Sequence, residues 1–394
     1  MVKIGIVDLP LHIGKVPQWL ANKMQKLAKA ILEVMVIEFG EDEIVKRFSD
    51  PLWFQAFNNI IGMDWDSSGS TTVTLGILKS VTWRYTELGV LILGGKRSRA
   101  LNVPKEIEKA SEILGLSTQR IEELREVSRL GAKADTALLQ DGYTLYHHSL
   151  IISRRTWSII QQGMNTSVKL ARRYHLTNSL FKIEKDIEGT LHSGIACNHR
   201  SSVLNLIDTR SRNTRRILLD LIAENTNKLI KELKTVNRIL KRNESLEKWL
   251  RGVDYKPVDL KNLKSIYYKP IKLSQRFLQT LNTITLQKAN SIRELLSIRG
   301  VGAEVIRALT LIADLIYSEK PSFNDPVTHP LDPFIYSYAH GGKDGIPYPV
   351  RPDLLDQTIM TLEEAIEKAK IGNTEKLQML RKLRKLFRDL GARF

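Results

Sequence analysis

The stretch YTLYHHSLIISRRTWSIIQQGMN, residues 143–165, carries the clearest secondary-structure pattern in the chain. Residues 143–153 and 157–161 are runs rich in aliphatic and aromatic side chains, which is typical of β-strands. The polar residues 154–156 between them, Arg-Arg-Thr, are typical of a tight turn. The pattern predicts a β-hairpin with polar residues at its ends.

Strand-like and helix-like patterns alternate before this hairpin. Short β-like runs predict strands at residues 3–7, 71–77 and 88–93. Apolar residues at helical spacing predict helices at residues 18–39, 51–61 and 104–131. We therefore expect residues 1–165 to form a mixed α/β domain that contains the candidate active site.

The chain after the hairpin is predicted to be mainly helical. Residues 166–255 are expected to form a basic helical region, and the irregular, Pro-containing residues 251–273 a linker. Residues 276–394 are expected to form a second domain with basic C-terminal helices, interrupted by a Pro- and Gly-rich loop at residues 320–353. The predicted class is α+β, an N-terminal mixed α/β domain followed by a mainly helical C-terminal domain.

The composition favours an anionic partner. The 394 residues include 60 Lys+Arg against 43 Asp+Glu, a net charge of +17. Residues 151–250 hold 19 basic and 9 acidic residues and so supply most of the excess. Such a charge favours DNA, RNA or a membrane surface as partner. The alternative is a solvated, ion-pair-rich surface of the kind common in thermophiles.

The same composition limits the cellular compartments in which the protein is expected. Cys197 is the single cysteine, so neither a disulfide nor a cysteine zinc site can form within the chain. No stretch approaches the length of a membrane span, and the N-terminus lacks a signal-peptide pattern. We expect a cytoplasmic protein without a membrane partner, and oligomerisation stays open.

The strongest local motif is LLSIRGVGAEVIRAL, residues 295–309. Gly300 and Gly302 permit positive φ and close approach of the backbone to a phosphate, and Val301 would anchor the turn in the core. The amides after Gly302 open a helix whose dipole favours an anion. The segment resembles the helix-hairpin-helix of DNA repair enzymes, polymerases and ligases, which implies binding to the DNA backbone without base readout. The alternative is a Gly-rich connection without a ligand. The predicted DNA contacts are Arg299, Gly300, Val301, Gly302, Arg307 and Lys343.

Polar side chains at the ends of the hairpin form the first candidate active site. Alternate residues of a strand face the same way, so a histidine and the QQGMN run of residues 161–165 could meet at one end of a sheet. A histidine, strand, turn and second strand ending in Gly and Asn resembles the motif of phospholipase-D-like phosphodiesterases, whose histidine is the nucleophile. The lysine of that motif is Ser149 or Leu150 here. The alternative is an edge hairpin with polar ends. The predicted catalytic residues are His147, His148, Asp141, Gln162 and Lys96.

In that site His147 or His148 would act as nucleophile or general base, and Asp141 would orient it. A second candidate site is the metal pair Asp64 and Asp66 in GMDWDSSG, with Lys96 to offset transition-state charge. The candidate cofactor is a divalent metal, Mg²⁺ or Mn²⁺; Asp8 and His12 would lie beside it. The alternative for this loop is an Asp-rich turn that caps a helix or strand.

A third candidate site follows the two-glycine turn. Helix-hairpin-helix glycosylases carry a catalytic Asp after the second helix, and Asp325 occupies a similar place here. Some members use a Lys after the Gly-x-Gly; that position is Glu304, so the resemblance is to the monofunctional type. The alternative is a structural loop closing the domain. Residues that could line a base pocket or add polar groups are Phe323, Tyr336, His340, Lys343 and Asp344.

Seven segments together resemble one known family. They are GIVDLPLHIGKVP, DPLWFQAF, DWDSSG, LQDGYTLYHH, QQGMN, ARRYH and AHGGKDGIPYPV. The combination is similar to the prokaryotic domain-of-unknown-function family 763, found in archaea and bacteria. The resemblance implies one protein type with the two-glycine turn as an integral part, and it implies no particular reaction.

These observations lead to three expected functions. The first is a DNA-binding enzyme, a nuclease that cleaves phosphodiester bonds in DNA repair. The second is a DNA glycosylase that flips a base into a pocket beside Asp325. The third is a non-catalytic nucleic-acid scaffold.

Overall fold

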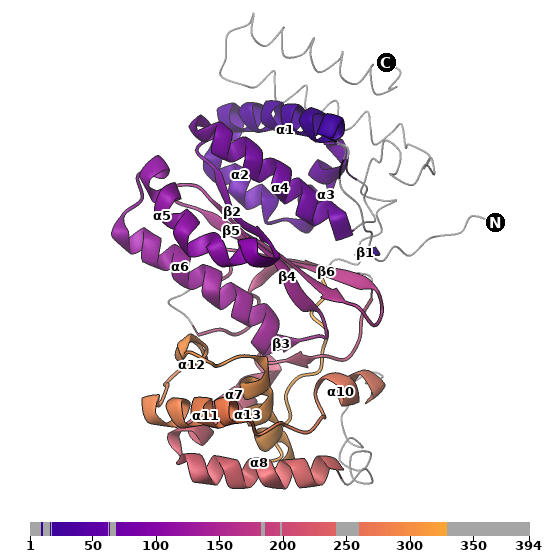
Figure 1. The fold of residues 1–394 in the computed structure, drawn as a ribbon, viewed down its shortest axis with the longest axis vertical. Helices are drawn as coiled ribbons and strands as arrows, with labels where there is room; N and C mark the ends of the chain where they lie inside the picture. Colours follow the sequence, from indigo (N-terminus) through magenta and orange to yellow (C-terminus); the bar gives the residue numbers. More distant parts are fainter. Residues whose placement is uncertain are drawn as a thin grey trace, which may run out of the picture.

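An antiparallel sheet forms the centre of the fold in the computed structural model (Figure 1). The structure describes residues 9–10, 16, 18–61, 63, 68–182, 186–197, 199–241 and 260–328. The strand order is β1-β6-β5-β4-β2, and β7 also pairs with β6. The strands are β1 (Leu9–Pro10), β2 (Leu91–Lys96), β4 (Thr144–Ile152), β5 (Trp157–Asn165), β6 (Leu170–Thr177) and β7 (His192–Ala196).

The predicted hairpin is confirmed as β4 and β5. Its strands are paired from Ile152 opposite Trp157 to Thr144 opposite Met164. The turn is closed because the Ser153 amide donates to the Thr156 carbonyl at 3.0 Å. The β2 strand pairs on the other edge of β4, as expected for a sheet built around this hairpin.

One face of the sheet is covered by the N-terminal helices, drawn in indigo and violet in Figure 1. These helices are α1 (Gln18–Phe39), α2 (Glu41–Phe48), α3 (Pro51–Ile60) and α4 (Ser68–Arg84). Asp50 begins α3 as predicted, because its carboxylate accepts from the amides of Leu52 and Trp53. A hydrophobic cluster joins these helices to Ile92, Ile151 and Ile160 of the sheet. Burial of this apolar face holds the helices in place.

The opposite face packs against α5 (Val103–Leu114) and α6 (Thr118–Lys133). Alternation along the strands sends Leu93, Leu150 and Ile159 to this side. The helix α6 continues into the π-helical turn η3 (Ala134–Leu138). A short 3-10 segment, η2 (Arg97–Asn102), connects β2 to α5.

The C-terminal helices form the lower part of Figure 1, around the buried helix α13. The small sheet of β3 (Leu139–Gln140) and β8 (Leu204–Asn205) lies beside them. The apolar core of these helices is continuous with the core under α6. The helices are α7 (Arg212–Ala223), α8 (Thr226–Lys241), α10 (Leu260–Ile266), α11 (Gln275–Gln287), α12 (Ile292–Ser297) and α13 (Ala303–Leu315).

The predicted α+β class is correct, and two local predictions are wrong. Residues 71–77 were expected as a strand and lie inside helix α4. Residues 166–211 were expected as helix and contain strands β6, β7 and β8. The predicted strand at residues 3–7 lies outside the described residues. Among the residues the structure describes, no helix combines the length and apolarity that crossing a membrane requires.

Candidate functional site

Four polar side chains form one row across the sheet, hereafter the cross-strand row: Lys96, His147, Gln162 and Arg173. Each is the direct partner of the next on the neighbouring strand, from β2 through β4 and β5 to β6. Directly opposed residues of antiparallel strands place their side chains on the same face. The row faces α3 and α4, because the Arg173 guanidinium contacts side chains of both helices. The structure thus brings together Lys96, His147 and Gln162, three of the predicted catalytic residues.

His147 is buried and uncharged within the row. Its side chain is 2% exposed, and its Nε2 lies 2.9 Å from the Ser149 hydroxyl. Burial, with added repulsion from His148 and Lys96, lowers the pKa of His147 from 6.5 to about 3. Its Nδ1 has no hydrogen-bond partner among the described residues. The imidazole is therefore neutral near pH 7, and its low pKa makes it a weak base.

A cleft of about 840 Å³ has both His147 and His148 in its lining, and His147 is the member of the row that lines it. It lies between η2 and the exposed side of α6, and the start of β4 forms its base. Lys96 does not line the cleft, but its Nζ lies 5.8 Å from the ring centroid of Tyr146, which does. The Tyr146 hydroxyl accepts a hydrogen bond from the Gln162 amide, which ties the base of the cleft to the row. The cleft also contains Arg97, Arg125 and Arg129.

His148 points to the other side of the sheet. Its Nδ1 lies 2.9 Å from Gln161 Oε1, and its Nε2 lies 2.8 Å from the Ser128 hydroxyl. Gln161 in turn donates to Asp135, which pairs with His192. Burial lowers the pKa of His148, so this imidazole too is neutral. Because both of its ring nitrogens are engaged, His148 is a member of an internal network and is separate from His147.

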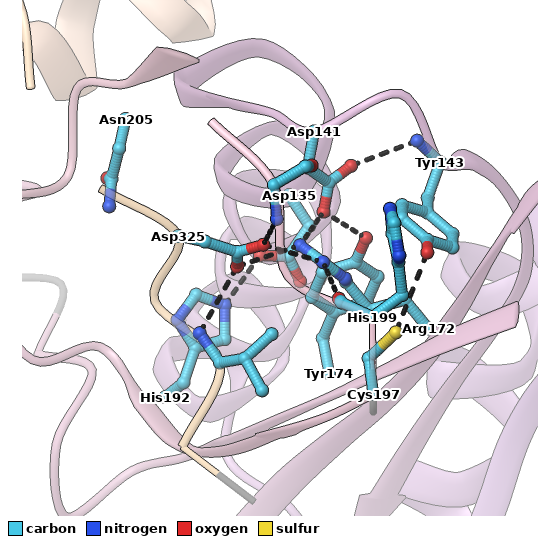
Figure 2. Close-up of polar contacts among 12 residues, drawn as sticks. Asp135, Asp141, Tyr143, Arg172, Tyr174, His192, Cys197, His199, Asn205 and Asp325 are labelled. Atoms are coloured by element: carbon cyan, nitrogen blue, oxygen red, sulfur yellow. Dashed lines mark hydrogen bonds and ion pairs between the residues drawn. The ribbon is translucent and has the colours of Figure 1, made fainter. Parts of the chain in front are cut away.

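Asp141 lies in a buried ion-pair cluster (Figure 2), and its side-chain partners among the described residues do not include His147 or His148. Its Oδ2 accepts from Arg172 Nη1 at 2.9 Å and from the Tyr174 hydroxyl at 2.7 Å. The expectation that Asp141 orients a catalytic histidine is therefore wrong for this arrangement. Burial raises the pKa of Asp141, although Arg172 and Tyr174 oppose the shift. The same arginine also holds Asp325, and its Nη1 donates to both carboxylates (Figure 2).

Asp325, the candidate glycosylase residue, has a structural role in the fold. It accepts two hydrogen bonds from Arg172 and one from the Ser201 amide. Phe323 is buried, with its ring centroid 5.4 Å from that of Tyr267. These contacts fasten the segment after α13 to β6, and they leave neither side chain facing an open pocket.

The two-glycine turn joins α12 to α13. Gly300 has φ +93°, and a Cβ there would lie 2.7 Å from the Thr280 hydroxyl, so only glycine fits. Val301 is buried as predicted. Gly302 has extended backbone, and nothing lies within 4 Å of where its Cβ would be. Lys133 Nζ on α6 donates to the Leu296 carbonyl at 2.7 Å and the Val301 carbonyl at 2.6 Å.

The two arginines of this motif have different surroundings. Arg299 is exposed beside Gly300. Arg307 is buried, and its guanidinium donates to the backbone carbonyls of Tyr267 and Lys269. The prediction that Arg307 contacts DNA is therefore wrong: it fastens the chain after α10 to α13.

Several predicted residues lie outside the part of the chain that the structure describes. They are Asp8, His12, Asp64, Asp66, Tyr336, His340, Lys343 and Asp344. Within the described ranges, no three His, Cys, Asp or Glu side chains are grouped so that they could hold a metal. The metal pair Asp64 and Asp66 thus stays a prediction.

Sequence reasoning missed Arg173 and Arg172. Both lie in LARRYHLT, which is strand β6 and is buried along its whole length. Two adjacent arginines in a buried strand must face opposite sides of the sheet. This alternation could have predicted one buried polar cluster on each side, the cross-strand row with Arg173 and the ion-pair cluster with Arg172. Their charge instead suggested a basic helical surface.

The fold and these sites define an α+β protein with helices on both faces of an antiparallel sheet and a cationic row beside a cleft. The chain belongs to the family described as "Protein of unknown function (DUF763)", whose model matches residues 5–350. No curated protein and no solved structure matches the chain.

Proposed function

We propose that the protein binds DNA and hydrolyses phosphodiester bonds at the cross-strand row. The observation that carries this proposal is the register that aligns Lys96, His147 and Gln162 in one row, of which His147 also lines a cleft. A phosphodiester needs cationic groups to stabilise the charge of the transition state and a base to activate the attacking group. The exposed ammonium of Lys96 would supply the first. The neutral imidazole of His147 would supply the second, as a weak base because burial lowers its pKa to about 3.

Helix α6 connects the cleft to the two-glycine turn, which supports a shared DNA path. Arg125 and Arg129 line the cleft, and Arg129 donates to the Ser297 hydroxyl at the end of α12. One turn further on, Lys133 holds the turn itself. A backbone phosphate held by the amides that follow Gly302 would direct the strand along α6 toward His147.

Two mechanisms remain to be separated by experiment. In one, His147 acts as base or nucleophile without a metal. In the other, Asp64 and Asp66 hold Mg²⁺ or Mn²⁺, and the row binds the phosphate. The purified chain is incubated with labelled duplex, single-stranded and damaged DNA, in each metal or in EDTA. Cleavage in EDTA that His147→Asn abolishes supports the first mechanism, and cleavage that requires metal supports the second.

A charge-matched pair of variants tests the role of Lys96. Lys96→Met should lower the cleavage rate by roughly 100-fold, the scale measured when one group that stabilises transition-state charge is removed. Lys105→Met, which removes an exposed lysine on α5, should leave the rate unchanged. Tight binding without product under every condition would make the protein a scaffold. Breaks that appear only after alkali on damaged DNA would make it a glycosylase.

A further inference from the structure

The inner end of the cross-strand row is a buried cation without a counter-ion. Arg173 is 0% exposed, and burial lowers its pKa to about 9. Its guanidinium donates to Gln55 Oε1 at 3.2 Å, the Thr71 hydroxyl at 3.4 Å and the Pro51 carbonyl at 3.4 Å. All three acceptors are neutral, and the guanidinium carbon lies 4.7 Å from the ring centroid of Phe54. No carboxylate of the described residues forms an ion pair with it. An unpaired buried charge is costly and is normally compensated.

Further polar atoms without partners lie on the two helices that contact this cation. Asn58, Ser70 and Thr74 are 0% exposed, and their side-chain polar atoms have no hydrogen-bond partner among the described residues. Asn58 lies about one helical turn after Gln55 on α3, and Thr74 about one turn after Thr71 on α4. These groups therefore extend the same helix faces that contact Arg173. Buried polar atoms in proteins are almost always satisfied, so the cluster points to a missing ligand.

The chemistry of the cluster selects the ligand. Helix α4 begins at Ser68 and is 17 residues long, so its positive dipole end lies at Thr71 and Ser70. The guanidinium, the helix start, the amide of Asn58 and the hydroxyls all offer donors. A cation would be repelled, and an apolar ligand would leave the donors unpaired. A small oxyanion fits because it accepts several hydrogen bonds and neutralises the arginine.

We propose that Arg173, Asn58, Ser70 and Thr74 bind a phosphate group, the terminal phosphate of a nucleic-acid strand. The proposal rests on the proposed function for its nucleic-acid source. Arg173 and His147 lie two strands apart, about 10 Å, so an end phosphate on the arginine would place a nearby phosphodiester of the same strand at His147. The enzyme would then act at phosphorylated ends.

Binding of inorganic phosphate to the full chain tests the site independently of catalysis. Titration calorimetry should show one site in the wild type. Arg173→Met should weaken it by roughly 10- to 100-fold and Thr74→Val by roughly threefold to tenfold. The matched control is Thr82→Val, a buried threonine two turns further along α4, which should bind phosphate like the wild type.

Thermal unfolding distinguishes a ligand site from a structural arginine. In phosphate-free buffer, Arg173→Met should unfold at the wild-type temperature or higher, because an uncompensated buried charge is removed. Phosphate should raise the unfolding temperature of the wild type only. No phosphate binding by the wild type, or equal binding by Arg173→Met, overturns the proposal.

Oligonucleotides identify the source of the phosphate. Strands with a 5′-phosphate, a 3′-phosphate or neither are compared for affinity. One phosphorylated end should bind at least about tenfold more tightly, and Arg173→Met should lose the preference. Equal affinity for all three ends overturns end recognition. If phosphate binds but no DNA is cut, the proposed nuclease activity fails and the phosphate site stands. If DNA is cut but phosphate does not bind, the phosphate site fails and the nuclease activity stands.

Discussion

Substitutions of Gly300 and Gly302 should have different effects, although both residues are glycines of the same turn. Gly300 has φ +93° and lies against Thr280, whose hydroxyl would be 2.7 Å from an added Cβ. Gly302 has extended backbone and open space at its Cβ position. Gly300→Ala should therefore lower stability the more, and Gly302→Val should mainly affect a ligand that approaches the backbone.

The magnitude follows from two contributions at Gly300. Holding alanine at positive φ costs about 1–2 kcal/mol, and the contact with Thr280 adds about 1 kcal/mol of strain. The total of about 2–3 kcal/mol should lower the unfolding temperature by several degrees. Adding Thr280→Ala removes the contact but leaves the φ strain, so the double variant should recover only part of the loss.

Gly302→Val should lower stability by about 1 kcal/mol, because Gly302 is the N-cap of α13 and valine is disfavoured at that position. Its affinity for DNA at moderate salt should fall by roughly tenfold, since valine keeps a phosphate from the amides. Thermal unfolding and fluorescence anisotropy with labelled duplex measure both quantities. Wild-type DNA affinity in a folded Gly302→Val protein would refute the assignment of the turn as a phosphate grip.

Three other predictions concern the buried polar groups. His147 has a folded pKa of about 3 against 6.5 unfolded, so its contribution to stability is complete above pH 6.5 and is lost as the pH falls toward 3. The stability lost over this range is at most roughly 5 kcal/mol. The unfolding temperature of His147→Gln should therefore depend less on pH than that of the wild type. Identical pH profiles of the two unfolding temperatures would contradict a buried neutral imidazole. Asp141→Asn should destabilise the protein by about 3 kcal/mol, because Arg172 loses the charge of one of its carboxylate partners. The cleavage rate per folded molecule should stay unchanged. Loss of cleavage without loss of stability would show that Asp141 has a catalytic role. Lys133→Met should cost about 1–2 kcal/mol and weaken DNA binding, because two carbonyls at the turn lose their donor; unchanged unfolding and affinity would show that Lys133 does not support the turn.

The hairpin and most helices were predictable because their patterns are local. The run before Arg154 and the run after it have strand composition, and Asp50 followed by Pro51 is a helix start. Helix α4 was not predictable in this way. Its residues 71–78 are mostly buried and consist mainly of Thr and aliphatic residues, so they show the composition of a strand and little helical contrast.

The candidate site was predictable only where it is formed by neighbouring strands. His147 and Gln162 face each other across the hairpin, so spacing alone places them together. Arg173 joins the row through β6, whose charged residues suggested a surface helix. Asp141 and Asp325 are far apart in sequence, and only the fold shows that Arg172 holds both. Long-range pairing of charges leaves no periodic trace in a single sequence.

The central claim is that the cross-strand row binds the phosphodiester that is cut. A structure of His147→Asn bound to an oligonucleotide tests it most directly, because this variant should bind the oligonucleotide without cleaving it. The account predicts a backbone phosphate within about 2.7–3.2 Å of Lys96 Nζ, on the His147 side of the cleft. DNA bound on another surface, with no phosphate near Lys96 or His147, would contradict it.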